Sequence, residues 1–216
     1  MSTETIVGSR GLADLLKSET WDLHKEAETT GFINQVLRGT ASLPSYISFL
    51  KNLKPIYETM ESSRRWLETY PRLKPYIGEP IARTHAIETD LVHLRTFCKK
   101  PVCPAISPNT LTYQADIKKA LMQNHPAMLA HIYVRYLGDL NGGLVLQRLL
   151  GKNFGLPEEC LNFYNFPKID NVSGFKKDFR KALNDIALPE DDEDRAIEAA
   201  KNAFRFNVAL STTLTG

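Results

Sequence analysis

Apolar residues recur along most of the chain with the spacing of an amphipathic helix, and they seldom alternate as they would in a strand. Between residues 12 and 28, for example, Leu12, Leu15, Leu16 and Leu23 fall on one helical face. No stretch makes a convincing strand, and neither a repeat nor a low-complexity region interrupts the pattern. The sequence therefore predicts an all-α protein with a single multi-helix domain.

Proline, polar caps and acidic residues mark the boundaries of the expected helices. Pro44 suits a first helical turn, Pro55 lies inside the same expected helix and should kink it, and Ser173 is a candidate N-cap. The acidic residues after Pro189 lie in a first turn, where the helix dipole favours them. We expect helices over residues 12–28, 43–70, 81–97, 111–124, 126–155, 173–187 and 189–210. The domain should cover residues 11–210, with flexible segments at 1–10 and 211–216.

Composition narrows the class of protein. The chain has 27 basic and 25 acidic side chains, a net charge of +2, and no basic tract, which argues against nucleic acid as the main partner. The start, MSTETIVGSR, lacks the apolar core of a signal peptide, and no apolar run approaches the roughly 20 residues that cross a bilayer. The 3 cysteines form no Cys-x-x-Cys pair and no disulfide framework. We expect a cytoplasmic protein with reduced thiols and no membrane segment.

The stretch YLGDLNGGLVLQRLL, which begins at Tyr136, concentrates glycines in a segment that otherwise predicts helix. Each interior glycine costs about 1 kcal/mol of helix stability relative to alanine. On an ideal helix one face carries glycines and polar groups, namely His131, Arg135, Gly138, Asp139 and Gly142. The other side is apolar and suits a core, namely Tyr133, Leu137, Leu140 and Leu144. The first face fits a broad, flat ligand, but it fits equally a close helix–helix contact with Arg135 and Asp139 as an i,i+4 ion pair.

The segment HIYVRYLGDLNGG resembles the signature of the haem oxygenases. LADLLKSETWDLHKEAETTGFI resembles the first helix of that family, and FKKDFRKALN and AFRFN match later segments in the same order and at similar spacing. The similarity covers roughly residues 10 to 210. It implies the all-α haem oxygenase fold, with haem between the first helix and a kinked, glycine-rich distal helix.

The resemblance places the axial iron ligand on His24, with Glu28 one helical turn later as the partner of its second ring nitrogen. Taken alone, a histidine on an amphipathic helix is more often a satisfied surface or core residue. The other histidines are His85, His93, His125 and His131. His131 is the main rival because it begins the glycine motif, but the resemblance gives it a supporting position.

On the opposite side of the haem, the resemblance assigns the catalytic groups. Asp139 would organise a water beside the bound oxygen, together with Arg135 and Tyr57, while Gly138 and Gly142 would let the helix backbone lie against the ring and permit a bend. The remaining haem contacts that it implies are Lys17, Ile33, Tyr133, Gly143, Lys176, Arg180 and Phe204. The basic and hydroxyl groups among them would hold the two propionates, and Lys177 would replace Lys176 if its helix were rotated.

Two positions depart from the family pattern. Val134 stands where many members have threonine, and Asn141 stands where most have serine. Each difference changes the hydrogen-bonding groups beside the distal water. These differences bear on the rate and on which meso carbon opens, and they leave the expected reaction in place.

The resemblance implies an oxidoreductase that cleaves haem b, its substrate and cofactor at once, with O2 into biliverdin, carbon monoxide and ferrous iron. No Gly-x-Gly-x-x-Gly fingerprint of a nucleotide site occurs, so the electrons would come from a separate reductase or ferredoxin. One alternative is a haem-binding or haem-trafficking protein that keeps the fold without turnover. Another is a ferritin-like di-metal protein, but His85, Glu88 and His93 have the wrong spacing for it and no second copy occurs.

Overall fold

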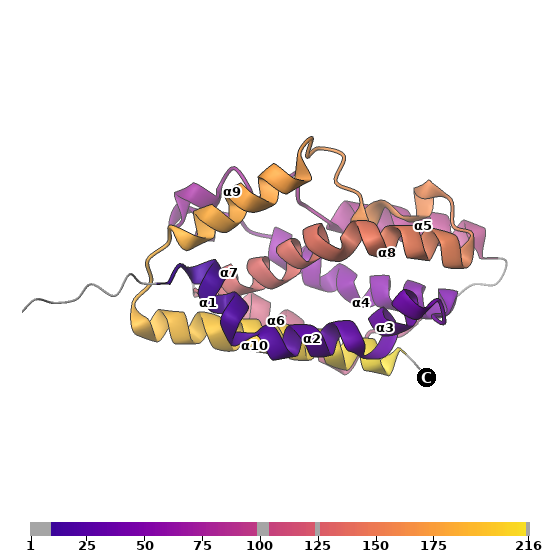
Figure 1. Ribbon diagram of the computed structural model, residues 1–216, viewed down its shortest axis with the longest axis horizontal. Helices are drawn as coiled ribbons and strands as arrows, with labels where there is room; N and C mark the ends of the chain where they lie inside the picture. The colour runs from indigo at the N-terminus through magenta and orange to yellow at the C-terminus, as the bar shows by residue number, and fades with distance from the viewer. Residues whose placement is uncertain (1–9, 99–103, 124–125, 215–216) are drawn as a thin grey trace, which may run out of the picture.

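The computed structural model describes residues 10–98, 104–123 and 126–214, and every regular element in these ranges is helical (Figure 1). The α-helices are α1 (Leu12–Glu19), α2 (Trp21–Thr29), α3 (Gly31–Arg38), α4 (Leu43–Glu61), α5 (Thr84–Phe97), α6 (Pro108–Met122), α7 (Ala127–Ile132), α8 (Gly138–Phe154), α9 (Val172–Asn184) and α10 (Glu190–Thr213). The shorter elements are η1 (Arg65–Glu68), η2 (Pro71–Leu73), η4 (Glu158–Cys160) and η5 (Asn162–Tyr164), all 3-10 turns, and the π-helical segment η3 (Tyr133–Leu137). The predicted all-α class is confirmed.

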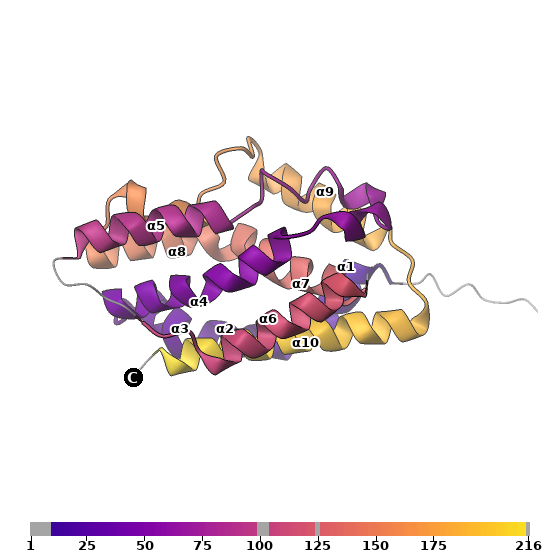
Figure 2. The same ribbon diagram turned by 180° about the vertical axis from the view of Figure 1, so that it is seen from behind.

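The long C-terminal helix α10 organises the arrangement of the other helices. It packs against α7 and α6 and also against α2 and α3 near the start of the chain, as Figures 1 and 2 show. Besides α10, α6 also contacts α4, and α4 in turn contacts α5. The N-terminal helices and the segment η3–α8 therefore lie on opposite sides of a shared interior. None of the helices in the described ranges has the length and apolarity needed to cross a membrane.

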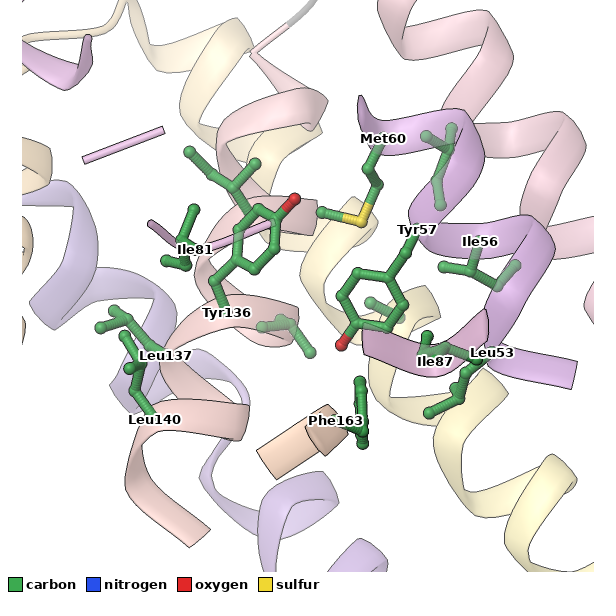
Figure 3. Close-up of a cluster of buried hydrophobic side chains, with 14 of the residues drawn as sticks. Leu53, Ile56, Tyr57, Met60, Ile81, Ile87, Tyr136, Leu137, Leu140 and Phe163 are labelled. Atoms are coloured by element: carbon green, nitrogen blue, oxygen red, sulfur yellow. The ribbon is translucent and has the colours of Figure 1, made fainter. Parts of the chain in front are cut away.

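A buried cluster joins α4 to the segment η3–α8 (Figure 3). The ring of Tyr57 on α4 lies 5.9 Å from that of Tyr136 on η3 and 5.6 Å from that of Phe163 on η5, measured between centroids. Leu53 and Leu140 belong to the same cluster and are buried. Burial of each such apolar side chain contributes roughly 1.5–3 kcal/mol, so the cluster holds the side chain of Tyr57 in place.

The first predicted helix is in fact two helices. Residues 12–28 were expected to be continuous, but α1 ends at Glu19 and α2 starts at Trp21, with Thr20 between them at φ −116° and ψ 9°. The buried hydroxyl of Thr20 donates to the carbonyl of Leu16 at 2.7 Å. This side-chain bond offers the backbone an alternative to the helical ladder, which is why a threonine favours a break here.

Other boundaries differ in smaller ways. Pro44 does lie in the first turn of α4 and Pro55 lies inside it, yet α4 ends at Glu61, before the predicted end at residue 70. The predicted cap Ser173 is wrong: the Asn171 side chain caps α9 by accepting from the N–H of Gly174 at 2.9 Å. α10 does begin with its acidic residues, as predicted, and it continues to Thr213.

The chain ends were expected to be flexible beyond residues 11 and 210, and these boundaries remain predictions. Residues 1–9 and 215–216 lie outside the described residues. Residues 211–213 are part of α10, and Ser211 is buried.

Candidate functional site

A cavity of about 550 Å³ lies between the N-terminal helices and the segment η3–α8. One wall comes from α2 and α3 and the facing wall from η3 and α8, while α9 contributes Arg180 and α10 contributes Phe204 and Asn207. Its polar and glycine lining consists of His24, Glu28, Tyr133, Arg135, Gly138, Asp139, Asn141, Gly142, Tyr164, Arg180 and Asn207. Its apolar lining includes Ile33, Phe49, Leu137, Val145 and Phe204. The volume falls in the range of roughly 300–1,000 Å³ that is usual for ligand and cofactor sites.

His24 stands on the α2 wall with partners on two sides. Its Nδ1 lies 3.8 Å from the Oε1 of Glu28, one helical turn later, and its ring meets that of Phe204 edge-on at 5.6 Å between centroids. Its side chain keeps 45% of its accessible surface, so the imidazole reaches the cavity. The structure thus brings together His24, Glu28, Ile33 and Phe204, as the sequence analysis expected.

Two of the three glycines open the facing wall. A Cβ built on Gly138 or on Gly142 would meet nothing within 4 Å, and both residues line the cavity. Gly143 serves another purpose, because a Cβ there would lie 2.9 Å from the Tyr164 ring. Gly143 was predicted as a contact of the bound group, but it allows close packing and does not line the cavity. Both explanations of the glycines therefore apply, each at a different position.

The π-helical segment η3 immediately precedes these glycines. A π-helical turn holds more residues than an α-helical turn, so it shifts the register of the faces on either side of it. The predicted face, drawn for an ideal helix, is therefore only partly correct: Arg135, Gly138, Asp139 and Gly142 line the cavity, but His131 does not. Leu144, expected in the core, is 51% exposed.

His131 instead faces α6 and α10 in the protein interior. It is 2% exposed, and its Nδ1 lies 3.2 Å from the Tyr113 hydroxyl. Burial lowers the pKa of His131 to about 4, so its imidazole is neutral at physiological pH. His85 and His93 are exposed on α5, and His125 lies outside the described residues. His24 is therefore the histidine that the structure places at the cavity.

A buried hydrogen-bond network stands behind the glycines. The Tyr57 hydroxyl donates to Oδ2 of Asp139. Arg135 donates to the same hydroxyl oxygen from Nε at 3.2 Å and from Nη2 at 3.0 Å. Its Nη1 donates to Oδ1 of Asn207 on α10. The direct Arg135–Asp139 ion pair left open by the sequence is absent from the described contacts, because the Tyr57 hydroxyl stands between the two groups.

Burial sets the protonation of this network. Desolvation raises the pKa of Asp139 to about 6, although Arg135 and the hydrogen bond from Tyr57 pull it down. Burial also raises the pKa of Tyr57 well above its usual value, so the phenol stays protonated and donates. The Asp139 carboxyl can consequently gain or lose a proton close to neutral pH.

Of the predicted propionate partners, the structure brings only two to the cavity. Tyr133 and Arg180 line it, and the charge of Arg180 partly offsets the burial that raises the pKa of Tyr133. Lys17 is exposed on α1, and Lys176 is half-buried on α9, one turn from Arg180; neither lines the cavity. Lys177, the alternative to Lys176, is also exposed and away from the lining.

Asn207 and Tyr164 are site residues that the sequence reasoning missed. Asn207 is the last residue of the AFRFN segment that carries Phe204, so the same match contained it. Tyr164 is the last residue of the short 3-10 turn η5 and had no comparable signal. The two departures, Val134 and Asn141, both line the cavity.

Comparisons with known proteins agree with this geometry. The model of the family described as "Heme oxygenase" matches residues 10–213. "Heme oxygenase 1" of Rattus norvegicus is 33% identical over 94% of this chain and 71% of its own length, and "Heme oxygenase" of Takifugu rubripes is 32% identical over 97% and 76%.

Solved structures give the same result. The haem oxygenase of Leptospira interrogans superposes with a TM-score of 0.81 at 30% identity, covering 94% of this chain and 99% of that one. Haem oxygenase-1 of Synechocystis sp. PCC 6803, solved in complex with haem, gives 0.84 at 28% identity, covering 94% and 92%. Fold, sequence and the geometry of the cavity together show that the chain belongs to the haem oxygenase family.

Proposed function

We propose that this protein binds haem b between α2 and the segment η3–α8 and cleaves it with O2 and external electrons. The products would be biliverdin, carbon monoxide and ferrous iron. The observation that carries the proposal is one cavity with His24 on one wall and, facing it, Gly138 and Gly142 in front of the buried Asp139–Tyr57–Arg135 network.

The residues present fit a haem in shape and in chemistry. Gly138 and Gly142 leave the facing wall without side chains, as a flat ring lying against a helix requires. Ile33, Phe49 and Phe204 supply apolar contacts for its faces and edge. Arg180 and Tyr133 supply a cation and a hydroxyl for its carboxylates.

On the α2 wall, His24 would ligate the iron through Nε2, because its Nδ1 already faces Glu28 at 3.8 Å. A carboxylate near the second ring nitrogen orients an imidazole and makes it a better ligand. Phe204, packed against the ring, limits its rotation further.

On the facing wall, the chain would hold protons and a water beside the bound haem. Bound haem would supply the iron and the meso carbon at which the oxidation is proposed to occur. Asp139, kept near its titration point by burial, can accept or donate a proton through a water in the cavity. Tyr57 and Arg135 fix the orientation of the carboxylate, and Asn207 fixes Arg135.

Electrons would come from a separate reductase or ferredoxin. Arg180 and Tyr133, which line the cavity, would set the rotation of the bound ring, and with it the meso carbon that opens. Lys17 and Lys176 would reach the propionates only after moving, since neither lines the cavity.

The test is to add one equivalent of haem to the purified protein and to follow its absorption after supplying a reductase or ascorbate in air. We expect the Soret band to decay while a biliverdin band grows. A Soret band that persists under working electron delivery would refute turnover and favour the haem-binding or haem-trafficking alternative.

A matched pair of variants locates the ligand. His24→Ala should weaken haem binding and change the ligand-field spectrum, whereas His93→Ala, at an exposed histidine away from the cavity, should match the parent protein. Both variants should keep the helical circular dichroism. If haem-bound His24→Ala kept the parent spectrum, the iron ligand would have to be a residue other than His24.

A further inference from the structure

Trp21 is a large apolar side chain that the fold leaves half exposed, with 47% of its surface accessible. It opens α2 and does not line the cavity. A large aromatic side chain in such a position exposes apolar surface to water without contributing to the core. Its contacts with neighbouring side chains indicate a role at the cavity wall instead.

The indole of Trp21 lies parallel to the imidazole of His24. The interplanar angle is 10° and the ring centroids are 6.2 Å apart, an offset stack between residues three apart on the same helical face. From α10, Phe204 meets the same imidazole edge-on. The His24 ring therefore has one aromatic neighbour from its own helix, α2, and another from α10.

The indole is itself held in place. The Nζ of Lys25 lies 4.9 Å from the centroid of the Trp21 ring, a cation–π contact at i,i+4. Lys25, Trp21 and His24 thus form a chain of contacts along one side of α2. An exposed indole with no such anchor would be free to change rotamer.

The contact matters because Glu28 does not fix the imidazole by itself. The 3.8 Å between Nδ1 of His24 and Oε1 of Glu28 exceeds hydrogen-bond distance, and both side chains are largely exposed. Without the indole, the side of the imidazole that faces Trp21 would be open to solvent. The plane of the ring is then determined by Trp21 and Phe204.

We propose that Trp21 is a positioning residue that holds the imidazole plane of His24. The proposal rests on the proposed function, in which His24 ligates the haem iron. The orientation of the imidazole plane affects overlap with the iron d orbitals, so the indole would tune the ligand field and the strength of the iron–histidine bond.

The experiment compares Trp21→Ala, Trp21→Leu and Trp21→Phe, loaded with haem in the ferric state with cyanide as the probe ligand. The spread of the electron paramagnetic resonance g values of a low-spin ferric haem reports the orientation of the axial imidazole. We expect shifted or heterogeneous g values in the Ala and Leu variants and one species close to the parent in Phe. With the imidazole no longer held in one orientation, haem should dissociate about 2- to 10-fold faster from the Ala variant.

Phe97→Ala provides the control, since Phe97 is 42% exposed at the end of α5 and does not line the cavity. It should leave the g values and the dissociation rate unchanged. Unfolding of the haem-free variants would reveal any general loss of stability, and Trp21→Leu keeps apolar bulk if Trp21→Ala proves poorly folded.

Parent-like g values and dissociation rates in both Trp21→Ala and Trp21→Leu would overturn the proposal. If His24→Ala removes the axial ligand while the Trp21 variants stay parent-like, only the positioning role fails. If His24→Ala keeps the parent spectrum, the proposed function itself fails at its iron ligand.

Discussion

The carboxyl group of Asp139 lies buried behind the glycine wall of the cavity. It is 9% exposed and accepts a hydrogen bond from Tyr57, which in turn accepts two from Arg135. Burial outweighs these favourable partners and raises the pKa of Asp139 to about 6. The chain therefore accepts a cost in stability at neutral pH to keep a titratable group in the candidate site.

That cost can be measured. The folded pKa of Asp139, about 6, lies above the usual 3.8, so the folded state binds the proton more tightly and stability falls as the pH rises through this interval. The difference between these two pKa values corresponds to about 3 kcal/mol of unfolding free energy. Asp139→Asn, which keeps an acceptor for Tyr57, should gain up to about 3 kcal/mol relative to the parent between pH 4 and pH 7.5.

Urea unfolding of the two haem-free proteins at several pH values tests this expectation. All other carboxyl groups are shared by the pair, so the difference between the two curves isolates Asp139. A difference in unfolding free energy that does not change with pH would contradict the raised pKa.

At the scale of elements, the segment from α7 through η3 to α8 decides which groups reach the cavity. An unbroken α-helix would have placed His131 beside Arg135 and Gly138. The π-helical segment Tyr133–Leu137 changes that register, and His131 pairs with Tyr113 in the interior. The periodicity of apolar residues does not reveal this local irregularity. Because of it, His131 does not reach the cavity, and His24 remains the candidate iron ligand.

The glycines of α8 give a paired prediction. Gly142→Ala should stabilise the haem-free protein by roughly 0.5–1 kcal/mol through helix propensity, since its methyl group meets nothing within 4 Å. The same methyl group would enter the cavity and weaken haem binding. Gly143→Ala should instead destabilise the protein by about 1–3 kcal/mol, because its Cβ would lie 2.9 Å from the Tyr164 ring.

Thermal unfolding without haem and a haem titration separate the two effects. The assignment of these glycines would be wrong if Gly142→Ala lost stability, or if it bound haem as tightly as the parent.

At the scale of the whole molecule, the contact between the start of α3 and the C-terminal helix α10 shapes the cavity. Gly31 starts α3 at φ +57°, and a Cβ there would lie 2.3 Å from the backbone carbon of Ser211 in α10. In addition, the Ser211 hydroxyl donates to the carbonyl of Thr30 at 3.3 Å and accepts from the N–H of Ile33 at 3.2 Å. The α2–α3 wall, which carries His24 and Ile33, is thereby held against α10.

Gly31→Ala should consequently cost about 2–4 kcal/mol of stability, from a left-handed backbone and a clash that only movement of α10 can relieve. Gly39→Ala is the matched control. Gly39 also has positive φ, +73°, but the nearest atom to its Cβ is 3.6 Å away, so only the backbone strain of about 1–2 kcal/mol remains. Chemical denaturation of both variants measures the difference, and equal losses would contradict the proposed role of the contact.

The sequence by itself determined the helical class and most helix positions, because periodicity and caps are local properties of the chain, and the resemblance of several segments to the haem oxygenases indicated the family. It also pointed to His24, Glu28, Ile33, Phe204 and the Gly138–Asp139–Gly142 wall, and all of these line the cavity. Only the tertiary structure decided which distant groups meet. The Tyr57 hydroxyl bridges Asp139 and Arg135 across 82 and 78 residues of chain, and Asn207 reaches Arg135 across 72. Such contacts depend on the π-helical register of η3 and on the packing of η3 against α4 and α10, and neither follows from the spacing of apolar residues within a single helix.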